Sequence, residues 1–201
     1  MPKKRKKIRI FSALEVANIC GVVNQTAINW IKGKYLKAFT TPGGQYRVYA
    51  DDLHSFLESR GMRIPDELAE IVAEDARNQK ILIVDDDADL NNLLLRYFEK
   101  TRPEQAVLQA FDGFEAGRIL AEAKPGIVIL DINLPGIDGH KLCKKIKSDP
   151  SLGNPQVIAI TGIPDDTLEA TILAEGADAF VTKPFAPDEL ARRIDALAEE
   201  D

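Results

Sequence analysis

The sequence contains little cysteine and no long apolar stretch. Its 201 residues include two cysteines, Cys20 and Cys143, whose separation fits neither a metal-binding motif nor a disulfide framework. No apolar run approaches the roughly 18 residues that span a bilayer, so we expect no association with a membrane. The basic first residues are not followed by the apolar segment of a secretory signal. We therefore expect a cytoplasmic protein.

Charge is distributed unevenly along the chain. Residues 1–63 hold 12 Lys and Arg against 4 Asp and Glu, residues 64–80 hold 2 against 5, and residues 81–201 hold 12 against 23. The composition, 45% apolar and 29% charged, is typical of a folded globular protein. A small basic segment joined to an acidic one indicates a polyanion-binding domain attached to a domain with another task.

The pattern divides the chain into four regions. We expect a basic arm over residues 1–9, a small domain over 10–60, a helical linker over 61–79 and a larger domain over 80–201. The linker carries Leu68, Ile71 and Val72 at helical spacing, which predicts an apolar stripe. The stripe needs a covering surface, either on the chain's own domains or on a partner chain, and the sequence does not distinguish the two.

The small domain has the pattern of helix, turn, helix, hairpin and helix. Ser12 and Glu15 form a capping box ahead of the first helix, and Gly21 ends that helix. Asn24 is a suitable N-cap for a second helix over 25–32, and Asp51 for a third. Two short strands, over 36–40 and 45–49, flank a Pro-Gly-Gly turn.

Short β-branched runs alternate with helical stretches in the larger domain. They predict strands over 81–84, 106–108, 127–130, 157–160 and 179–181, in a mostly parallel sheet covered on both faces. Ligands bind such sheets at the carboxyl ends of the strands. The residues that follow the predicted strands are therefore candidate site residues: Asp85, Asp86, Asp87, Asp131, Thr161, Gly162, Lys183 and Pro184.

These side chains suggest a metal-assisted reaction of a phosphoryl group. Several carboxylates at one sheet edge repel each other and need a cation, and Mg²⁺ prefers oxygen ligands of this kind. A carboxylate can act as nucleophile toward a phosphoryl group, while a lysine and a hydroxyl bind the phosphoryl oxygens. Each residue alone is more often a helix cap or a turn hydroxyl, so only the complete set carries the prediction.

Residues 80–198 resemble a response-regulator receiver domain of two-component signalling, in the stretches 81–87, 130–139, 159–162 and 181–185. The resemblance implies an α/β doubly wound, flavodoxin-like fold with strand order 2-1-3-4-5. It also implies that Asp131 is the phosphoacceptor, that Asp85, Asp86 and Asp131 hold Mg²⁺ with the backbone carbonyl of Asn133, and that Thr161 and Lys183 bind the phosphoryl group. The peptide bond before Pro184 is expected to be cis.

Three positions within the receiver-like region need separate comment. Phe180 stands where the family often has Tyr, so Thr161 and Phe180 form the expected switch pair without a phenolic hydroxyl. Ile163, two residues after Thr161, is apolar and leaves the lifetime of an acyl phosphate open. Asp87 is expected to cap a helix rather than to bind metal.

Residues 10–58 resemble a winged helix-turn-helix of the MerR/excisionase-like family, in the stretches 12–17, 21–22, 28–32 and 41–47. Amide side chains match adenine edges in the major groove, lysine and hydroxyl side chains suit phosphates, and glycines let the wing backbone approach the duplex. We therefore expect Gln25 and Asn29 to contact bases, and Thr26, Lys32 and Lys34 to contact phosphates. Gly43 and Gly44 of the wing would approach the duplex, and Arg47 would reach phosphate or the minor groove.

Together these features predict a DNA-binding response regulator, not an enzyme, that accepts a phosphoryl group from a histidine kinase or phosphotransfer protein. Its DNA-binding domain precedes its receiver. Phosphorylation is expected to favour a homodimer, and the resemblance to receiver domains implies that the surface concerned covers roughly residues 165–198. The alternative is an adaptor whose helix-turn-helix binds protein instead of double-stranded DNA. An aspartyl-phosphate phosphatase is disfavoured, because that family needs a second Asp where this chain has Asn133.

Overall fold

The computed structural model describes residues 9–136, 138–162 and 166–200. The chain forms two compact units, Met1–Asp75 and Ala76–Asp201, and each is described by itself. Of the predicted features, residues 1–8 of the basic arm, Ile163 and Asp165 lie outside the described residues. None of the helices in the described ranges combines the length and the apolar character that a membrane span requires.

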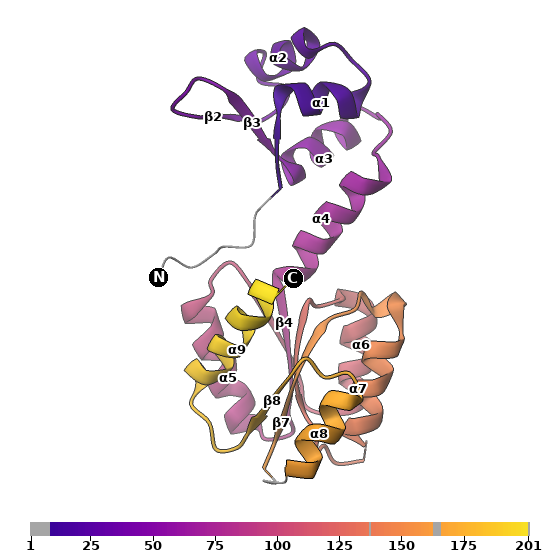
Figure 1. Ribbon diagram of the computed structural model, residues 1–201, viewed down its shortest axis with the longest axis vertical. Coiled ribbons are helices and arrows are strands. Elements are labelled where there is room, and N and C mark those ends of the chain that lie inside the picture. Colours follow the sequence, from indigo (N-terminus) through magenta and orange to yellow (C-terminus); the bar gives the residue numbers. More distant parts are fainter. Residues whose placement is uncertain (1–8, 137, 163–165, 201) are drawn as a thin grey trace. The chain divides into compact units, whose positions relative to one another are not determined.

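The first unit is a small helical domain with a three-stranded antiparallel sheet. Its elements are β1 (Ile10–Ser12), α1 (Ala13–Cys20), α2 (Asn24–Lys32), β2 (Phe39–Thr40), β3 (Tyr46–Tyr49), α3 (Ala50–Ser59) and the first part of α4 (Asp66–Asn78). The strand order is β1-β3-β2, with β2 and β3 forming the predicted hairpin (Figure 1). The predicted helix-turn-helix and wing are thus present, and β1 adds a strand that the sequence did not indicate.

The caps of the small domain agree with the prediction at one helix and differ at two. Ser12 and Glu15 form the expected capping box, and Gly21 ends α1 with a left-handed φ of 65°. The prediction of Asn24 as N-cap was wrong, because α2 begins one residue earlier and Val23 is the N-cap, without a side-chain hydrogen bond. The prediction of Asp51 was also wrong, because β3 continues directly into α3 and Tyr49 is the N-cap.

The apolar stripe of α4 packs against the small domain. Leu68 is 2% exposed and belongs to the core that also contains Phe11, Val16 and Leu53, while Ile71 and Val72 pack against the same core. The sequence left open whether the stripe is covered by the chain's own domains or by a partner chain. In the structure, the chain's own first unit covers it. About 50 residues bury too little apolar surface for a robust core, and α4 enlarges it.

The second unit is a parallel five-stranded sheet with helices on both faces. Its remaining elements are β4 (Lys80–Val84), α5 (Ala88–Thr101), β5 (Ala106–Ala110), α6 (Gly113–Ala123), β6 (Ile127–Asp131), α7 (Gly139–Ser148), a 3-10 turn (Pro150–Leu152), β7 (Gln156–Thr161), α8 (Asp166–Ala174), β8 (Ala179–Thr182) and α9 (Pro187–Glu200). The strand order β5-β4-β6-β7-β8 is the predicted 2-1-3-4-5 order.

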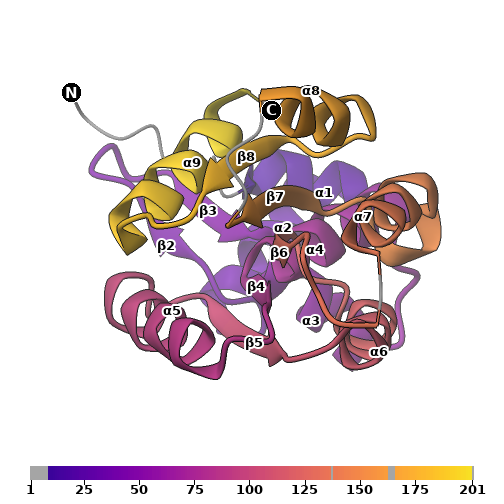
Figure 2. The ribbon, with the colours of Figure 1, turned by 90° about the horizontal axis from the view of Figure 1, so that it is seen from below.

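Two apolar layers enclose the parallel sheet. Side chains of α5 and α9 cover one face, with Phe98 and Leu190 fully buried. Side chains of α6, α7 and α8 cover the other face, with Leu120, Ile146 and Ile172 buried there. The two groups of helices lie on opposite sides of the strands in Figures 1 and 2. This double cover explains why the central strands are continuous apolar runs rather than alternating patterns.

The loop from β6 to α7 depends on a glycine. A Cβ added to Gly139 would lie 2.5 Å from both Cα and the carbonyl oxygen of Ile132, so no larger residue fits there without a backbone shift. Asp138 caps α7 by accepting from the backbone N–H groups of His140 and Lys141. The expected cis peptide bond before Pro184 is present.

Candidate functional site

The strand ends bring the predicted acidic residues together at one edge of the parallel sheet. Asp85 and Asp86 directly follow β4, Asp131 is the last residue of β6, Thr161 ends β7, and Lys183 follows β8. One carboxylate oxygen from each of Asp85, Asp86 and Asp131 lies within 4.8 Å of those from the other two. Asp85 and Asp131 are buried, at 0% and 5% exposure, whereas Asp86 is exposed.

Lys183 joins the two buried carboxylates. Its Nζ lies 2.6 Å from Oδ2 of Asp131 and 2.8 Å from Oδ2 of Asp85. Burial raises the pKa of the Asp85 carboxyl group, and the hydrogen bonds from Lys183 and from the Asp87 backbone oppose that shift. Burial would lower the pKa of Lys183, but its hydrogen bonds to Asp131 and Asp85 outweigh burial and raise it. The ammonium group therefore stays charged between its two acidic partners.

Backbone amides occupy the second oxygen of each buried carboxylate. Oδ1 of Asp85 accepts from the Asp87 N–H at 2.9 Å, and Oδ1 of Asp131 accepts from the Asn133 N–H at 2.8 Å. These bonds fix the rotamers of both acids, so Oδ2 of each points toward Lys183. Asp87 also caps α5 by accepting from the N–H groups of Asp89 and Leu90, as predicted.

The predicted switch residues are both buried. The Thr161 hydroxyl donates to Oδ1 of Asn133 at 2.7 Å, and its side chain is 0% exposed. Phe180 is 8% exposed and belongs to the apolar cluster on the α6, α7 and α8 face of the sheet. Its ring is thus already packed inward in this structure.

The donor set fits a hard divalent cation. Three carboxylates and one ammonium leave the cluster of Asp85, Asp86, Asp131 and Lys183 with a net charge of −2 at neutral pH. A divalent cation would neutralise that charge, and carboxylate oxygens are the ligands that Mg²⁺ prefers. The residues present therefore suit magnesium better than a softer metal, which favours His or Cys ligands.

Sequence analysis missed a buried amide beside this cluster. Asn91 of α5 is 0% exposed, and its Nδ2 donates to the backbone carbonyls of Asp85 and Ala110, both at 3.0 Å. Its Oδ1 accepts from Nε2 of Gln109 at 3.0 Å. One usable signal was its position, because Asn91 falls on the same helical face as Leu94 and Phe98, where an apolar residue is expected.

The two predicted base-reading residues of α2 and one predicted phosphate contact, Lys32, lie on one exposed face. Gln25, Asn29 and Lys32 follow each other at intervals of four and three residues and are exposed. Nε2 of Gln25 donates to Oδ1 of Asn29 at 3.0 Å, so the two amides form one hydrogen-bonding group. The opposite face of α2 buries Ala27 and Ile31, and Thr26 is half-buried between the two faces.

The hairpin of β2 and β3 presents the predicted wing. Gly43 and Gly44 are exposed at its tip, where Gly44 has a φ of 78° and donates its N–H to the Thr41 carbonyl. Arg47 is half-buried and donates to the Gln45 side chain and the Tyr46 carbonyl. The guanidinium thus has partners within the hairpin and would exchange them to contact a ligand.

The part of the first unit that follows Glu15 and ends with β3 contains basic residues but no acidic ones. Residues 16–50 contain four Lys and Arg residues, Lys32, Lys34, Lys37 and Arg47, and no Asp or Glu. Lys37 pairs with Asp52 of α3 at 3.0 Å, whereas Lys32 and Lys34 are exposed near the end of α2. This segment therefore offers a positive surface of the kind that binds a polyanion.

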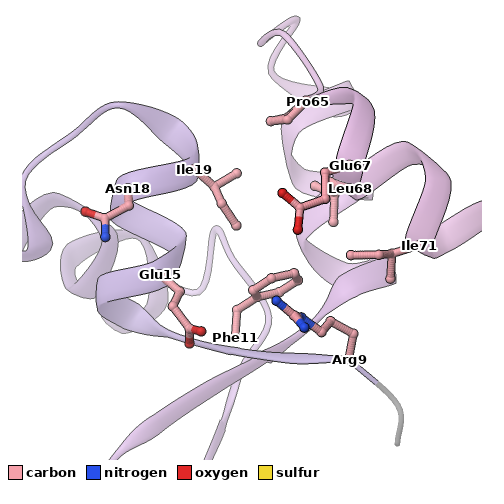
Figure 3. Close-up of a pocket in the computed structure, with 9 residues that line it drawn as sticks. All are labelled: Arg9, Phe11, Glu15, Asn18, Ile19, Pro65, Glu67, Leu68 and Ile71. Carbon is pink, nitrogen blue, oxygen red and sulfur yellow. The ribbon is translucent and has the colours of Figure 1, made fainter.

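A small pocket of about 190 Å³ lies between α1 and α4 of the first unit. Figure 3 shows the apolar side chains of Phe11, Ile19 and Leu68 in it, with exposed charged groups that include Arg9 and Glu67. Its volume is below the 300–1,000 Å³ that is usual for small-molecule sites. The pocket therefore does not compete with the acidic cluster as the candidate site.

Comparison with known proteins gives two domain matches. A family model described as a response regulator receiver domain matches residues 81–195, and one described as a helix-turn-helix domain matches residues 10–61. The predicted order of the two domains is thereby confirmed. A solved signal receiver domain of a DNA binding response regulator protein (merR) from Colwellia psychrerythraea covers 60% of this chain and 98% of its own, with a TM-score of 0.57 and 36% identity.

Curated relatives resemble part of the chain. The probable transcriptional regulator ycf27 of Guillardia theta is 37% identical over 125 residues, which cover 59% of this chain and 45% of the relative. The DNA-binding response regulator MtrA of Mycobacterium tuberculosis is 35% identical over 123 residues, which cover 61% of this chain and 51% of the relative. The chain thus spans about half the length of the curated relatives it matches.

Proposed function

The chain belongs to the response regulator receiver domain family, and on that premise we propose that it is a DNA-binding regulator controlled by a phosphoryl group on Asp131. The observation that carries the proposal is the pair of buried carboxylates, Asp85 and Asp131, held by one ammonium group at the strand ends. The cationic helix-turn-helix in the same chain supports DNA as the output.

Asp131 acts as the nucleophile in the proposed reaction. An oxygen of its carboxylate forms a bond to the phosphorus of a phosphohistidine on a histidine kinase or phosphotransfer protein, and the phosphorus–nitrogen bond breaks with its electron pair going to the imidazole. Lys183, already 2.6 Å from Oδ2 of Asp131, neutralises a phosphoryl oxygen. The Asn133 N–H holds the other carboxylate oxygen of Asp131, which orients the attacking one.

Magnesium would be held by Asp85, Asp86 and Asp131 with the backbone carbonyl of Asn133. When bound, it supplies positive charge to the phosphoryl oxygens and so lowers the cost of bringing them to a cluster of carboxylates. The Thr161 hydroxyl then exchanges its bond to Asn133 for one to the phosphoryl group. This exchange, together with the buried ring of Phe180 on the neighbouring strand β8, is the proposed switch.

The phosphorylation test uses acetyl phosphate as donor. Intact-mass measurement of the full chain in the presence of Mg²⁺ should show one added phosphoryl group in the wild type and none in Asp131→Asn. Asp86→Ala should be phosphorylated more slowly at the same Mg²⁺ concentration, because one ligand is lost. Equal labelling of wild type and Asp131→Asn would refute Asp131 as the acceptor.

The DNA test measures binding of the full chain to random double-stranded DNA over a series of salt concentrations. We expect binding that weakens steeply with salt, because Lys and Arg contacts to phosphates release counterions. After selection of a preferred site, Asn29→Ala should lose about 1–3 kcal/mol on that site and discriminate less between sequences. Absence of any shift with duplex DNA would favour a protein-binding role for the helix-turn-helix.

A further inference from the structure

One buried polar side chain of the second unit lies outside the residues assigned above. Among the described residues, four polar or charged side chains are buried: Asp85, Asn91, Asp131 and Thr161. Three of them belong to the strand-end cluster, and the fourth, Asn91, contacts that cluster through the backbone of Asp85. A buried amide is costly unless it is hydrogen-bonded, so its bonds indicate what it does.

The Asn91 amide extends the pairing of two strands past their ends. β4 ends at Val84 and β5 at Ala110, and the Asp85 N–H still donates to the Ala110 carbonyl at 3.1 Å. Beyond that bond the chain turns away toward α5, and Nδ2 of Asn91 donates to the carbonyls of both Asp85 and Ala110. Gln109 donates to Oδ1 of Asn91. This bond orients the amide so that Nδ2, its donor end, faces the two carbonyls.

The carbonyl of Asp85 is part of the peptide group that joins Asp85 to Asp86. Because a peptide group is planar, a hydrogen bond that holds its carbonyl also holds the direction in which the Asp86 residue leaves it. Asp86 is exposed, and the packing of its side chain therefore does little to direct its carboxylate toward Asp85 and Asp131. The orientation of this peptide group then helps to set where the Asp86 carboxylate lies relative to those of Asp85 and Asp131, which each have an oxygen within 4.8 Å of it.

We propose that Asn91 is a positioning residue for the magnesium site, acting through the Asp85–Asp86 peptide group rather than by touching the metal. This inference rests on the proposed function, since it assigns Asp85 and Asp86 as ligands. It adds α5 to the elements that build the site. It also gives the hydrogen bond between Gln109 and Asn91 a role, which is to orient the Asn91 amide. Partners behind metal ligands influence affinity in the same way, by orienting the ligands.

The test compares magnesium binding in full-length variants. Asn91→Leu keeps the side-chain volume and removes the hydrogen bonds. Asn92→Leu is the matched control, because Asn92 is the next residue of α5 and is exposed. Its replacement removes the 3.3 Å bond from Gln109 to Oδ1 of Asn92 but keeps the bond from Gln109 to Asn91. Isothermal titration calorimetry with MgCl₂, on variants shown to be folded by circular dichroism, should give a Kd about tenfold higher for Asn91→Leu. The Kd of Asn92→Leu should match that of the wild type.

A second measurement separates positioning from simple stability. The Mg²⁺ concentration that half-saturates phosphorylation by acetyl phosphate should rise in Asn91→Leu, while the rate at saturating Mg²⁺ stays close to that of the wild type. If Asn91→Leu does not fold, Gln109→Leu serves instead, because Gln109 is only partly buried and its loss frees the Asn91 amide to turn. Gln109→Leu should raise the Kd in the same direction by a smaller factor.

The outcomes are distinguishable. A folded Asn91→Leu with lowered thermal stability and an unchanged Kd would overturn the positioning role and leave the proposed function intact. An unchanged Kd in Gln109→Leu, where the first variant fails to fold, would overturn it equally. A wild-type chain that binds no magnesium would refute the proposed function, and this inference with it.

Discussion

At the scale of single residues, the buried carboxylates of Asp85 and Asp131 have the same pattern of hydrogen-bond partners. Each places one oxygen on a backbone N–H and the other on Lys183. Removing Lys183 would leave two carboxylates buried at one strand edge without their countercharge, which is far more costly than losing an exposed ion pair. The cluster therefore depends on one ammonium group until a cation or a phosphoryl group changes the charge around it.

Replacement of Lys34 should affect DNA binding and the free energy of unfolding in opposite directions. Its φ is 59°, a left-handed conformation that costs a non-glycine residue roughly 1–2 kcal/mol, and its side chain is exposed. Lys34→Gly should therefore keep or raise the free energy of unfolding, although part of the gain is lost to greater freedom of the unfolded chain. If Lys34 contacts phosphate, the same variant should weaken binding to all duplexes and reduce the salt slope by about 0.9.

The control for this prediction is Lys32→Ala. Lys32 lies in ordinary helical backbone at the end of α2, so its loss should weaken DNA binding without any gain in stability. Unfolding followed by the fluorescence of Trp30, the single tryptophan of the chain, reports on the first unit. Lys34→Gly with unaltered DNA affinity would remove Lys34 from the DNA contacts.

At the scale of elements, the parallel sheet and the start of α1 were predictable, and the starts of α2 and α3 were not. Each predicted strand of the sheet lies within two residues of the observed one, because buried parallel strands are continuous β-branched runs. The site residues followed from this, since they come directly after those runs. The strand β1 was missed because three residues, Ile10–Ser12, are too few to show an alternating pattern.

Tertiary packing explains the two wrong caps. Asn24 has the better side chain for capping α2, yet the burial of Ala27 and Ile31 fixes the helix so that Val23 occupies the cap position. Asn91 escaped notice for a related reason. Its partners are Asp85, which follows β4, and Ala110, which ends β5. No local pattern in α5 indicates a hydrogen bond to a residue 19 positions away.

The missing cap of α2 gives a prediction. Val23 is 71% exposed and has the extended backbone of an N-cap, so Val23→Ser supplies an acceptor for the first N–H groups of α2. We expect the first unit to gain about 1 kcal/mol in the free energy of unfolding, measured by urea titration with Trp30 fluorescence. Val22→Ser, which removes a side chain packed against the core, should lose stability instead. A loss in both variants would contradict the capping argument.

At the scale of the whole molecule, the first compact unit, Met1–Asp75, includes the part of α4 that the sequence pattern assigns to a linker. Leu68 of α4 is buried in its core, and burial of one leucine contributes about 1.5–3 kcal/mol. A fragment of residues 1–75 should therefore be more stable to urea than a fragment of residues 1–60 by at least about 2 kcal/mol. Leu68→Ala in the longer fragment should remove most of the difference. Equal stability of the two fragments would show that α4 adds nothing to the core.

Phosphorylation is expected to shift a monomer–dimer balance of the full chain. A single DNA-binding module buries only about 600–1,000 Å², so two modules together bind more tightly. The resemblance to receiver domains implies that the surface concerned runs over α8, β8 and α9. Moving a population from 1:99 to 99:1 requires about 5.5 kcal/mol, so we expect a partial shift that depends on concentration.

Light scattering over a concentration series, with and without acetyl phosphate, measures this shift. Asp131→Asn, treated in the same way, is the control. A mass that stays constant on phosphorylation while DNA affinity rises would refute dimerisation and favour release of an occluded DNA-binding domain.

The direct passage of β3 into α3 has a consequence for the entropy of binding. β3 is the central strand between β1 and β2, no loop residue separates it from α3, and backbone bonds between Thr41, Gly44 and Gln45 close the hairpin tip. The base of the wing has therefore already lost most of its conformational freedom before a ligand arrives. Binding of a duplex to this hairpin therefore requires less loss of backbone entropy than binding to a flexible loop would. More of the favourable contact free energy then remains as affinity.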